Sequence, residues 1–420
     1  MSAAGPSDYL LEVPDAVRRV VADVRALSAE RVPLLEAQGR VLASDVRSTI
    51  TLPPWANSAM DGYAVRAADL ETLPATLRVI ESVAAGQFPS QHVGALEAVR
   101  IMTGAPTPEG ADTVVRVEDT DGGLDRVVVR DARDAGKNVR PRGEDVIDGQ
   151  VAVTAGTVLG AAQLGVLAAI GEAAASMHRV PRVAILTSGD ELVELDRFDE
   201  VRAGRKIVSS NSITLQALVR AAGGEPHYLG IAADTRESLR EHLEHARDAD
   251  LLITSAGISV GEFDYVREVL LSLGADMKFW RVRMRPGAPI GFGWLGAMPW
   301  IGLPGNPVST MVTFELFARP VIRRMCGHTR LFRRPARVTI DDAITITPGL
   351  THFLRAIITP GPDGIRARLT GPQGSGILTS MSGANALLVV PPDRARREAG
   401  EQLLAIPLGD EAALSETFAL

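Results

Sequence analysis

The chain has 420 residues, of which 46% are hydrophobic and 23% are charged, so it is long enough for several globular domains with ordinary cores. Its net charge of −7 at pH 7 argues against a general binder of nucleic acid or of an anionic membrane. The single cysteine, Cys326, allows no disulfide within the chain. No signal peptide and no apolar run long enough to span a bilayer are visible. We therefore expect a cytoplasmic protein.

The sequence pattern changes along the first 178 residues. Residues 14–27 carry apolar side chains at helical spacing, and Pro14 suits a first helical turn. Residues 51–145 consist of short strand-like runs separated by Gly, Pro and Asp, which is typical of a small β domain. The apolar stretch between Gly160 and Gly171 predicts one compact helix.

From about residue 179 onwards, strand-like and helix-like segments alternate, which predicts a parallel sheet with flanking helices. One of the predicted helices starts near Asn211, a plausible N-cap, and ends at Gly223. The segment from residue 329 to the end returns to short strands and predicts a second β domain.

Three predicted strands of the alternating region end in unusual loops. These are "TSGDE" (187–191), "TSAGISVGEFDY" (254–265) and "GLPGNP" (302–307). Pro and Gly can simply end strands and start helices. Ligands, however, bind beyond the carboxyl ends of strands in an open parallel sheet, and glycines let the backbone approach them. Three such loops on one edge favour a preformed pocket.

Charged residues near these loops suggest a metal and an anion. Carboxylates collected around one cleft would suit Mg²⁺ together with phosphate oxygens, although each one alone is more often solvated surface. The candidates are Asp190, Glu191, Asp234 and Asp264, with Asp61 and Asp145 farther upstream. Arg281, Arg283 and Arg285 alternate and would share one face of a strand, as an anion site or as a solvated edge. The sequence contains no GxxxxGK[ST], CxxC or HExxH pattern.

Six motifs occur in an order that closely resembles the MoeA / gephyrin E-domain family, the molybdopterin molybdenumtransferases. They are "NSAMDGYAVR", "RIMTGAPTPEGADTVV", "GKNVRPRGEDV", "SGDEL", "GISVGEFDY" and "GLPGNPVS". The resemblance extends from about residue 10 to 410. It implies a four-domain, L-shaped subunit of the α/β plus β class, with a MogA-like parallel α/β domain and two smaller β domains.

The resemblance also implies domain boundaries and a partner. The elongated connector domain would comprise residues 28–50 and 146–178, and the inserted β domain residues 51–145. The α/β molybdopterin-binding domain would comprise residues 1–27 and 179–328, and the C-terminal β domain residues 329–420. Family members form a homodimer in which the inserted β domain of one subunit faces the α/β domain of the other.

Members of this family insert molybdate into adenylylated molybdopterin (molybdopterin-AMP) with Mg²⁺ and release AMP. By motif, the implied catalytic residues are Asp61, Thr103, Asp145, Asp190 and Glu191. The implied metal ligands are Glu191, Asp234 and Asp264. Pro304 and Pro307 would shape the pterin pocket, and Arg285, Arg355 and Ser375 would serve the anion. The other implied substrate-binding residues are Ser210, Asn211, Gly257, Ser259, Gly305 and Asn306.

Three positions depart from the family pattern. Ala288 replaces the lysine of "PGKP", Ser209 replaces the acid of Asp-Ser/Thr-Asn, and Ala256 replaces a glycine. These departures keep an alternative open, in which the chain is a gephyrin-like scaffold with weakened catalysis. Such a scaffold would bind a disordered peptide tail of a tubulin-like division protein or of a membrane protein. We expect no nucleic-acid partner and no direct membrane insertion.

Overall fold

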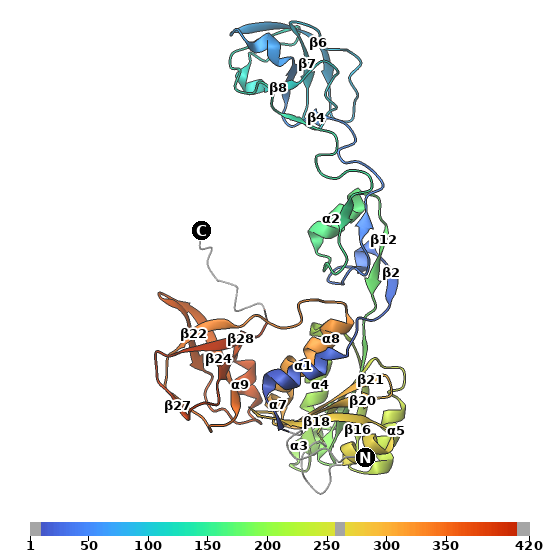
Figure 1. The fold of residues 1–420 in the computed structure, drawn as a ribbon, viewed down its shortest axis with the longest axis vertical. Coiled ribbons are helices and arrows are strands. Elements are labelled where there is room, and N and C mark those ends of the chain that lie inside the picture. The colour runs from blue at the N-terminus through green and yellow to red at the C-terminus, as the bar shows by residue number, and fades with distance from the viewer. Residues whose placement is uncertain (1–9, 257–264, 410–420) are drawn as a thin grey trace. The chain divides into compact units, whose positions relative to one another are not determined.

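The structure is a computed structural model that describes residues 10–256 and 265–409 (Figure 1). The chain divides into two compact units. The first unit comprises Met1–Glu30 and Ser176–Leu420, and the second comprises Arg31–Ala175. The first unit contains a mixed α/β layer and a β sheet, and the second contains another β sheet, which confirms the α/β plus β class. The finer division into four domains stays a prediction.

The centre of the first unit is a seven-stranded sheet with the order β1-β18-β20-β21-β17-β13-β16. Its strands are β1 (Leu10–Leu11), β13 (Arg182–Ser188), β16 (Glu225–Ala232), β17 (Leu251–Ser255), β18 (Asp276–Val282), β20 (Pro289–Leu295) and β21 (Met298–Leu303). Strands β16, β13, β17 and β21 are parallel, as the sequence predicts.

The predicted parallel sheet contains an antiparallel strand, β20. This strand runs antiparallel to both of its neighbours, β18 and β21. The cause is a two-residue hairpin turn, because Leu295 pairs with Met298 and only Gly296 and Ala297 lie between them. Gly296 has a φ of 62°, which such tight turns require. A hairpin of this length forces adjacent strands to run in opposite directions.

Helices cover both faces of this sheet, because alternate strand residues point to opposite sides. Val183 and Ile185 of β13 join one core with α1, α4, α7 and α8, whereas Ala184 and Leu186 join the other with α5 and α6. The helices are α1 (Val13–Ala22), α4 (Ser210–Ala221), α5 (Arg236–Glu244), α6 (Tyr265–Ser272), α7 (Pro307–Thr313) and α8 (Arg319–Met325). A short helix, α3 (Phe198–Arg202), lies outside both cores.

The sequence predicts where the helices start more accurately than it predicts which residues cap them. Pro14 lies in the first turn of α1, as predicted, but the helix ends at Ala22 rather than near residue 27. The prediction of Asn211 as an N-cap is wrong, because α4 begins one residue earlier and its N-cap is Ser209. Gly223 follows the end of α4 with a φ of 96°, so it stops the helix as expected.

The C-terminal part of the first unit is a six-stranded sheet with the order β19-β24-β25-β22-β28-β26, in which β24 also pairs with β26. Its strands are β19 (Met284–Arg285), β22 (Ala336–Ile340), β24 (Thr351–Gly361), β25 (Gly364–Leu369), β26 (Ala386–Val390) and β28 (Gln402–Pro407). Helix α9 (Leu378–Ser382) accompanies them. The short strands predicted for this segment are therefore confirmed, and β19 adds a strand to their sheet from the segment between β18 and β20.

The second unit is built on a five-stranded sheet with the order β8-β5-β7-β6-β9. The strands are β5 (Gly62–Val65), β6 (Ala75–Val83), β7 (Glu97–Ile101), β8 (Thr113–Arg116) and β9 (Arg126–Val129). Smaller strand pairs join β4 (Asn57–Ser58) with β10 (Val139–Arg140) and β3 (Val46–Arg47) with β11 (Val151–Val153). The predicted compact helix is α2 (Ala161–Ala169). Strands β2 (Ala29–Pro33) and β12 (Ala174–His178) also pair.

Candidate functional site

The ends of the parallel strands surround a cavity of about 410 Å³, which we call the edge cavity. Its lining residues come from the ends of β13, β17 and β21 and from the start of α4. They are Thr187, Glu191, Leu192, Ile207, Val208, Ser209, Ser210, Asn211, Ser255, Ala256, Pro289, Pro304, Gly305, Asn306 and Pro307. All three predicted strand-exit loops contribute to it through the residues that the structure describes. Glu191 is the charged member of this set.

The turn between β21 and α7 is held by a dense set of hydrogen bonds. The hydroxyl of Thr310 donates to the carbonyls of Pro304 (2.6 Å) and Asn306 (3.0 Å). A Cβ atom on Gly305 would lie 3.2 Å from the Cβ of Ala256, so the neighbouring loop approaches the backbone closely here. Pro307 starts α7, where a missing N–H costs nothing. The two prolines and Gly305 thus form a rigid wall of the edge cavity.

Asn211 ties this wall to two other loops. Its Nδ2 donates to the Gly305 carbonyl (2.7 Å) and to the Ser255 hydroxyl (2.9 Å). Because a carbonyl can only accept, this bond fixes the orientation of the amide. The Oδ1 atom of Asn211 and the Oγ atom of Ser209 are buried and have no hydrogen-bond partner within the described residues. Such atoms cost free energy when left unpaired, which makes them candidates for contacts that form on ligand binding.

The acidic residues beside the edge cavity form a close group. The backbone N–H of Asp234 donates to the Asp190 carboxylate (3.1 Å), and the N–H of Asp190 points back to the Asp234 carboxylate (3.4 Å). Burial raises the pKa of Asp234, and the charges of Asp190 and Glu191 raise it further. A local excess of negative charge is therefore built into this edge.

A second cavity, of about 950 Å³, lies between the α/β layer and the C-terminal sheet of the same unit; we call it the arginine cavity. Arg285, Ala288, Ser309, His352, Arg355 and Ser375 are among its lining residues. Its described lining contains two arginines and no carboxylate. Burial lowers the pKa of His352, whose Nε2 contacts the Thr347 carbonyl at 3.0 Å. The cavity suits an anion, and its cationic wall lacks a lysine at Ala288.

Arg355 lines the arginine cavity, yet its side chain is completely buried. The guanidinium donates to the carbonyls of Pro372, Gln373 and Gly374 and to the hydroxyl of Ser380. These four hydrogen bonds fix the segment that leads to Ser375. The sequence predicts that Arg355 contacts the anion directly. The geometry instead favours a positioning role, in which Arg355 holds that segment in place.

The three alternating arginines do not form one anion site. Arg281, Arg283 and Arg285 are all exposed while Val282 and Met284 between them are buried, so they share a face as expected. The segment nevertheless passes from β18 to β19, and each sheet takes part of it. Arg283 faces Glu12 at 3.5 Å. Of the three, Arg285 is the one that lines the arginine cavity.

In the second unit, the predicted pair Asp61 and Thr103 lies together. The backbone N–H and the hydroxyl of Thr103 both donate to one Asp61 carboxylate oxygen at 2.7 Å. These bonds, the backbone one first, lower the pKa of Asp61. The carboxylate is thus held ionised and oriented on an exposed loop.

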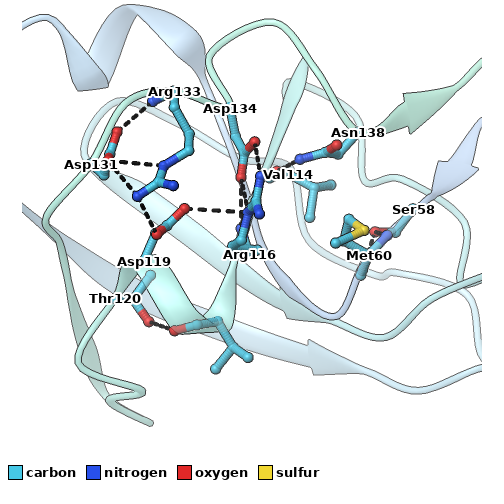
Figure 2. A network of polar contacts seen from close by, with 11 residues as sticks. Ser58, Met60, Val114, Arg116, Asp119, Thr120, Asp131, Arg133, Asp134 and Asn138 are labelled. Carbon is cyan, nitrogen blue, oxygen red and sulfur yellow. Dashed lines mark hydrogen bonds and ion pairs between the residues drawn. The ribbon is translucent and has the colours of Figure 1, made fainter.

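A network of ion pairs supports the loop that carries Asp61 (Figure 2). Arg116, at the end of β8, contacts the Asp134 carboxylate through Nε and Nη2 at 3.0 Å and Asp119 at 3.3 Å. Beyond Asp134, Asn138 donates from its side chain to the Val114 carbonyl. The Asn138 carbonyl accepts the N–H of Ala59, two residues before Asp61. The network therefore joins β8, the segment 134–138 and the Asp61 loop.

We expect Asp134→Asn to loosen this part of the second unit. The Arg116 hydrogen bonds lower the pKa of Asp134 from its ordinary value to about 2. A depressed carboxyl pKa stabilises the fold above the unfolded value, and that stabilisation is lost as pH falls toward 2. At pH 7 the loss should be about 1–2 kcal/mol of local opening free energy.

Hydrogen exchange of peptides covering residues 113–140 measures this opening. Asp131→Asn is the control, because Asp131 also pairs with an arginine but is 41% exposed in its side chain. Equal protection in both variants at pH 7 would contradict a supporting role for Asp134.

Other predicted site residues lie in the second unit or outside the described residues, so the structure does not place them in these cavities. Asp145 lies in the second unit, where its N–H donates to the Leu52 carbonyl and it lines a small cavity of about 110 Å³. Gly257, Ser259 and Asp264 lie outside the described residues. Among those that are described, no group of three or more His, Cys, Asp or Glu residues could hold a metal ion. The three-residue metal set of Glu191, Asp234 and Asp264 stays a prediction.

Sequence reasoning missed several residues of the two cavities. Pro289 and Ser255 line the edge cavity, and Thr347 and His352 line the arginine cavity. Pro289 starts β20, and the hairpin sequence "WLGAMPW" at the other end of this strand indicates the direction in which β20 runs. No local signal marks His352, because its position depends on β19 pairing with β24.

Comparisons with known proteins agree with this architecture over nearly the whole chain. Residues 11–171 match the MoeA N-terminal region (domain I and II), and residues 337–408 match the MoeA C-terminal region (domain IV). Residues 184–324, which form both walls of the edge cavity, match a probable molybdopterin binding domain. The α/β layer therefore belongs to the molybdopterin-binding class of α/β domains.

Similar proteins extend this match to full length. Molybdopterin molybdenumtransferase 2 of Mycobacterium tuberculosis is 38% identical over 397 residues, which cover 92% of this chain and 97% of that protein. The molybdopterin molybdenumtransferase of Nostoc sp. is 37% identical over 402 residues, covering 90% and 88%. A crystal structure of the molybdopterin biosynthesis moeA protein from Pyrococcus horikoshii OT3 matches 95% of this chain and 100% of that one, with 30% identity and a TM-score of 0.81. The chain belongs to the MoeA family of molybdopterin molybdenumtransferases.

Proposed function

We propose that the chain acts in molybdenum cofactor biosynthesis, inserting molybdate into adenylylated molybdopterin and releasing AMP. The observation that carries this proposal is the pair of adjoining cavities in the first unit. One is a polar, preformed cavity at the carboxyl edge of the sheet, and the other has an arginine-lined wall. A substrate with a fused ring and a molybdate oxyanion require these two environments. The family relatives named above supply the reaction class.

In this proposal, the edge cavity binds the pterin. Its wall from Pro304 to Pro307 is rigid, and the unpaired oxygens of Ser209 and Asn211 are available to N–H groups of a ligand. Ser210 and Gly305 complete the polar part of the wall. The arginine cavity binds molybdate, where Arg285 supplies positive charge and Ser375 lies on the segment that Arg355 holds.

The acidic edge fits Mg²⁺ only when phosphate oxygens of the bound substrate complete the coordination of the ion. Glu191 and Asp234 supply two described carboxylates, and Mg²⁺ in proteins uses one or two carboxylates together with phosphate oxygens and water. When bound, the ion would neutralise phosphate charge as the phosphoanhydride bond breaks. Glu191 and Asp234 would hold it, and Asp190 keeps Asp234 oriented through the backbone contacts described above.

We also infer that the chain forms a homodimer. Helix α2 of the second unit contains no charged residue, and its buried side chain is Leu167. Val166 is 37% exposed, and Leu35, on the adjacent 3-10 helix, is 98% exposed. An uncharged apolar helix facing solvent is more typical of a subunit interface than of a monomer surface. A second copy of this chain would cover it.

None of the described helices combines the length and apolar character that crossing a bilayer requires. A cytoplasmic location remains our inference from the single cysteine. No observation favours the gephyrin-like scaffold over the enzyme, so we do not propose a peptide-tail partner.

The purified chain should convert adenylylated molybdopterin and molybdate, with Mg²⁺, into AMP and a cofactor that activates an apo-molybdoenzyme. Light scattering on the same preparation should give the mass of two chains. Absence of AMP and of cofactor at saturating molybdate would overturn the proposed activity, whatever the oligomeric state. Glu191→Ala, which removes the charged side chain of the edge cavity, should reduce AMP release at least a hundredfold.

A further inference from the structure

The edge cavity and the arginine cavity share three lining residues, Pro289, Pro304 and Asn306. Proline side chains cannot form hydrogen bonds. Among these shared residues, Asn306 is therefore the one with a polar side chain. A ligand in either cavity therefore has this residue in its wall.

The side chain of Asn306 also does not cap the helix that follows it. It is the N-cap of α7, a position where an asparagine side chain normally accepts an N–H from the first turn. Its side chain makes no such bond in this chain. The N–H of Val308 in the first turn instead donates to the carbonyl of Ser375 at 3.1 Å. A backbone group of the C-terminal sheet region thus satisfies the helix end.

The exposed Asn306 side chain has no hydrogen-bond partner that the described residues provide, and it stands beside a cavity with a net positive wall. A carboxamide is uncharged and has two N–H donors on one atom and an acceptor on the other. It can therefore donate to an oxyanion on one side and accept from an N–H group of a ring on the other, without the free-energy cost of burying a charge.

We propose that Asn306 is the contact that couples the two ligands. Its Nδ2 donates to the oxyanion in the arginine cavity, and its Oδ1 accepts from the ring ligand in the edge cavity. This inference rests on the proposed function and assigns to one residue the recognition of both substrates. The Ser375 carbonyl, by capping α7, keeps the amide available for this role.

Asn306→Asp is the sharpest test, because it keeps the size of the side chain and is an equally good helix N-cap. It replaces the donor by a carboxylate oxygen, so its effects on the two ligands should be opposite in sign. Molybdate alone should bind at least tenfold more weakly. Free pterin should bind as tightly as to the wild type or more tightly, because the carboxylate still accepts hydrogen bonds.

Both affinities are measured on the full chain, molybdate by calorimetry and pterin by its own fluorescence. Gln402→Glu is the matched control, since it adds the same charge at an exposed position of β28, outside both cavities. It should leave both dissociation constants unchanged. Asn306→Ala should weaken molybdate binding by about twofold to tenfold.

The outcomes separate the inference from the function on which it rests. If the wild type binds molybdate and Asn306→Asp binds it equally well, Asn306 does not contact the oxyanion and the inference is wrong, while the proposed function stands. Equal loss of molybdate and pterin affinity in Asn306→Asp would indicate a merely structural role and also overturn it. If the wild type binds neither ligand and releases no AMP, the proposed function itself fails and the inference fails with it.

Discussion

Replacing Arg355 by alanine is expected to remove about 3 kcal/mol or more from the stability of the first unit. The side chain is fully buried, and its four hydrogen bonds satisfy three carbonyls and one hydroxyl. Alanine would leave these acceptors without donors and would open a cavity where the guanidinium lies. The segment before Ser375 should then lose its fixed conformation.

Lysine cannot substitute for Arg355, because a single ammonium group cannot reach the acceptors that the planar guanidinium joins. Arg355→Lys should therefore be nearly as destabilising as the alanine variant. Thermal unfolding and hydrogen exchange at residues 370–376 give the two effects separately. Arg368→Ala is the control, because Arg368 is exposed on the neighbouring strand β25. Similar melting temperatures for Arg355→Ala and Arg368→Ala would show that Arg355 does not hold this segment.

Introducing lysine at Ala288 is expected to lower the molybdate concentration for half-maximal insertion by about tenfold to a hundredfold. Ala288 lines the arginine cavity and is partly exposed, so the new ammonium group can reach the cavity near Arg285. A well-placed charged hydrogen bond contributes about 1.5–3 kcal/mol to binding, which corresponds to that change in affinity.

The gain at Ala288→Lys should shrink at high salt, because screening weakens the attraction between exposed charges. Ala288→Met is a matched control, since it adds a chain of similar length without the charge. Molybdate titrations of the three proteins at low ionic strength decide the question. Superimposed curves for lysine and alanine would mean that this wall does not contact molybdate.

The parts of the fold that depend on local pattern were predictable from the sequence. The alternation of strands and helices after residue 179 gave the parallel strands β13, β16, β17 and β21 and their polar exits. Asp61 and Thr103 were expected together from the family motifs, and they share two hydrogen bonds.

The parts that depend on distant contacts were not predictable. Arg355 resembles an anion ligand in sequence, and only the return of the segment 372–374 over it shows that its donors are engaged. Asn211 has the residue type of a cap, but its amide is engaged by Ser255 and Gly305, which lie 44 and 94 residues away. Sequence spacing carries no information on such tertiary hydrogen bonds.

The left-handed backbone of Ala256 has a similar origin. Its φ of 76° is one that glycine adopts easily and alanine adopts at a cost. The resemblance to the family implies a glycine at this position, and the backbone of Ala256 has a conformation that suits glycine. Its N–H still donates to the Leu303 carbonyl at 3.1 Å.

The reversed direction of β20 has a consequence for how this protein can change over evolutionary time. Because β20 runs antiparallel to β21, it starts beside the end of β21, and the connection from Arg283 to Ala288 that precedes it lies at the ligand-binding edge. This connection contains the short strand β19, which pairs with β24 of the C-terminal sheet. Arg283, Arg285 and Ala288 of this connection are exposed or partly exposed and can be exchanged, whereas Met284 belongs to the core and a Cβ atom at Gly287 would lie 2.4 Å from Thr313. Preference for one metal oxyanion over another can therefore change through a few exposed positions of this connection, while its buried residues stay under selection for folding.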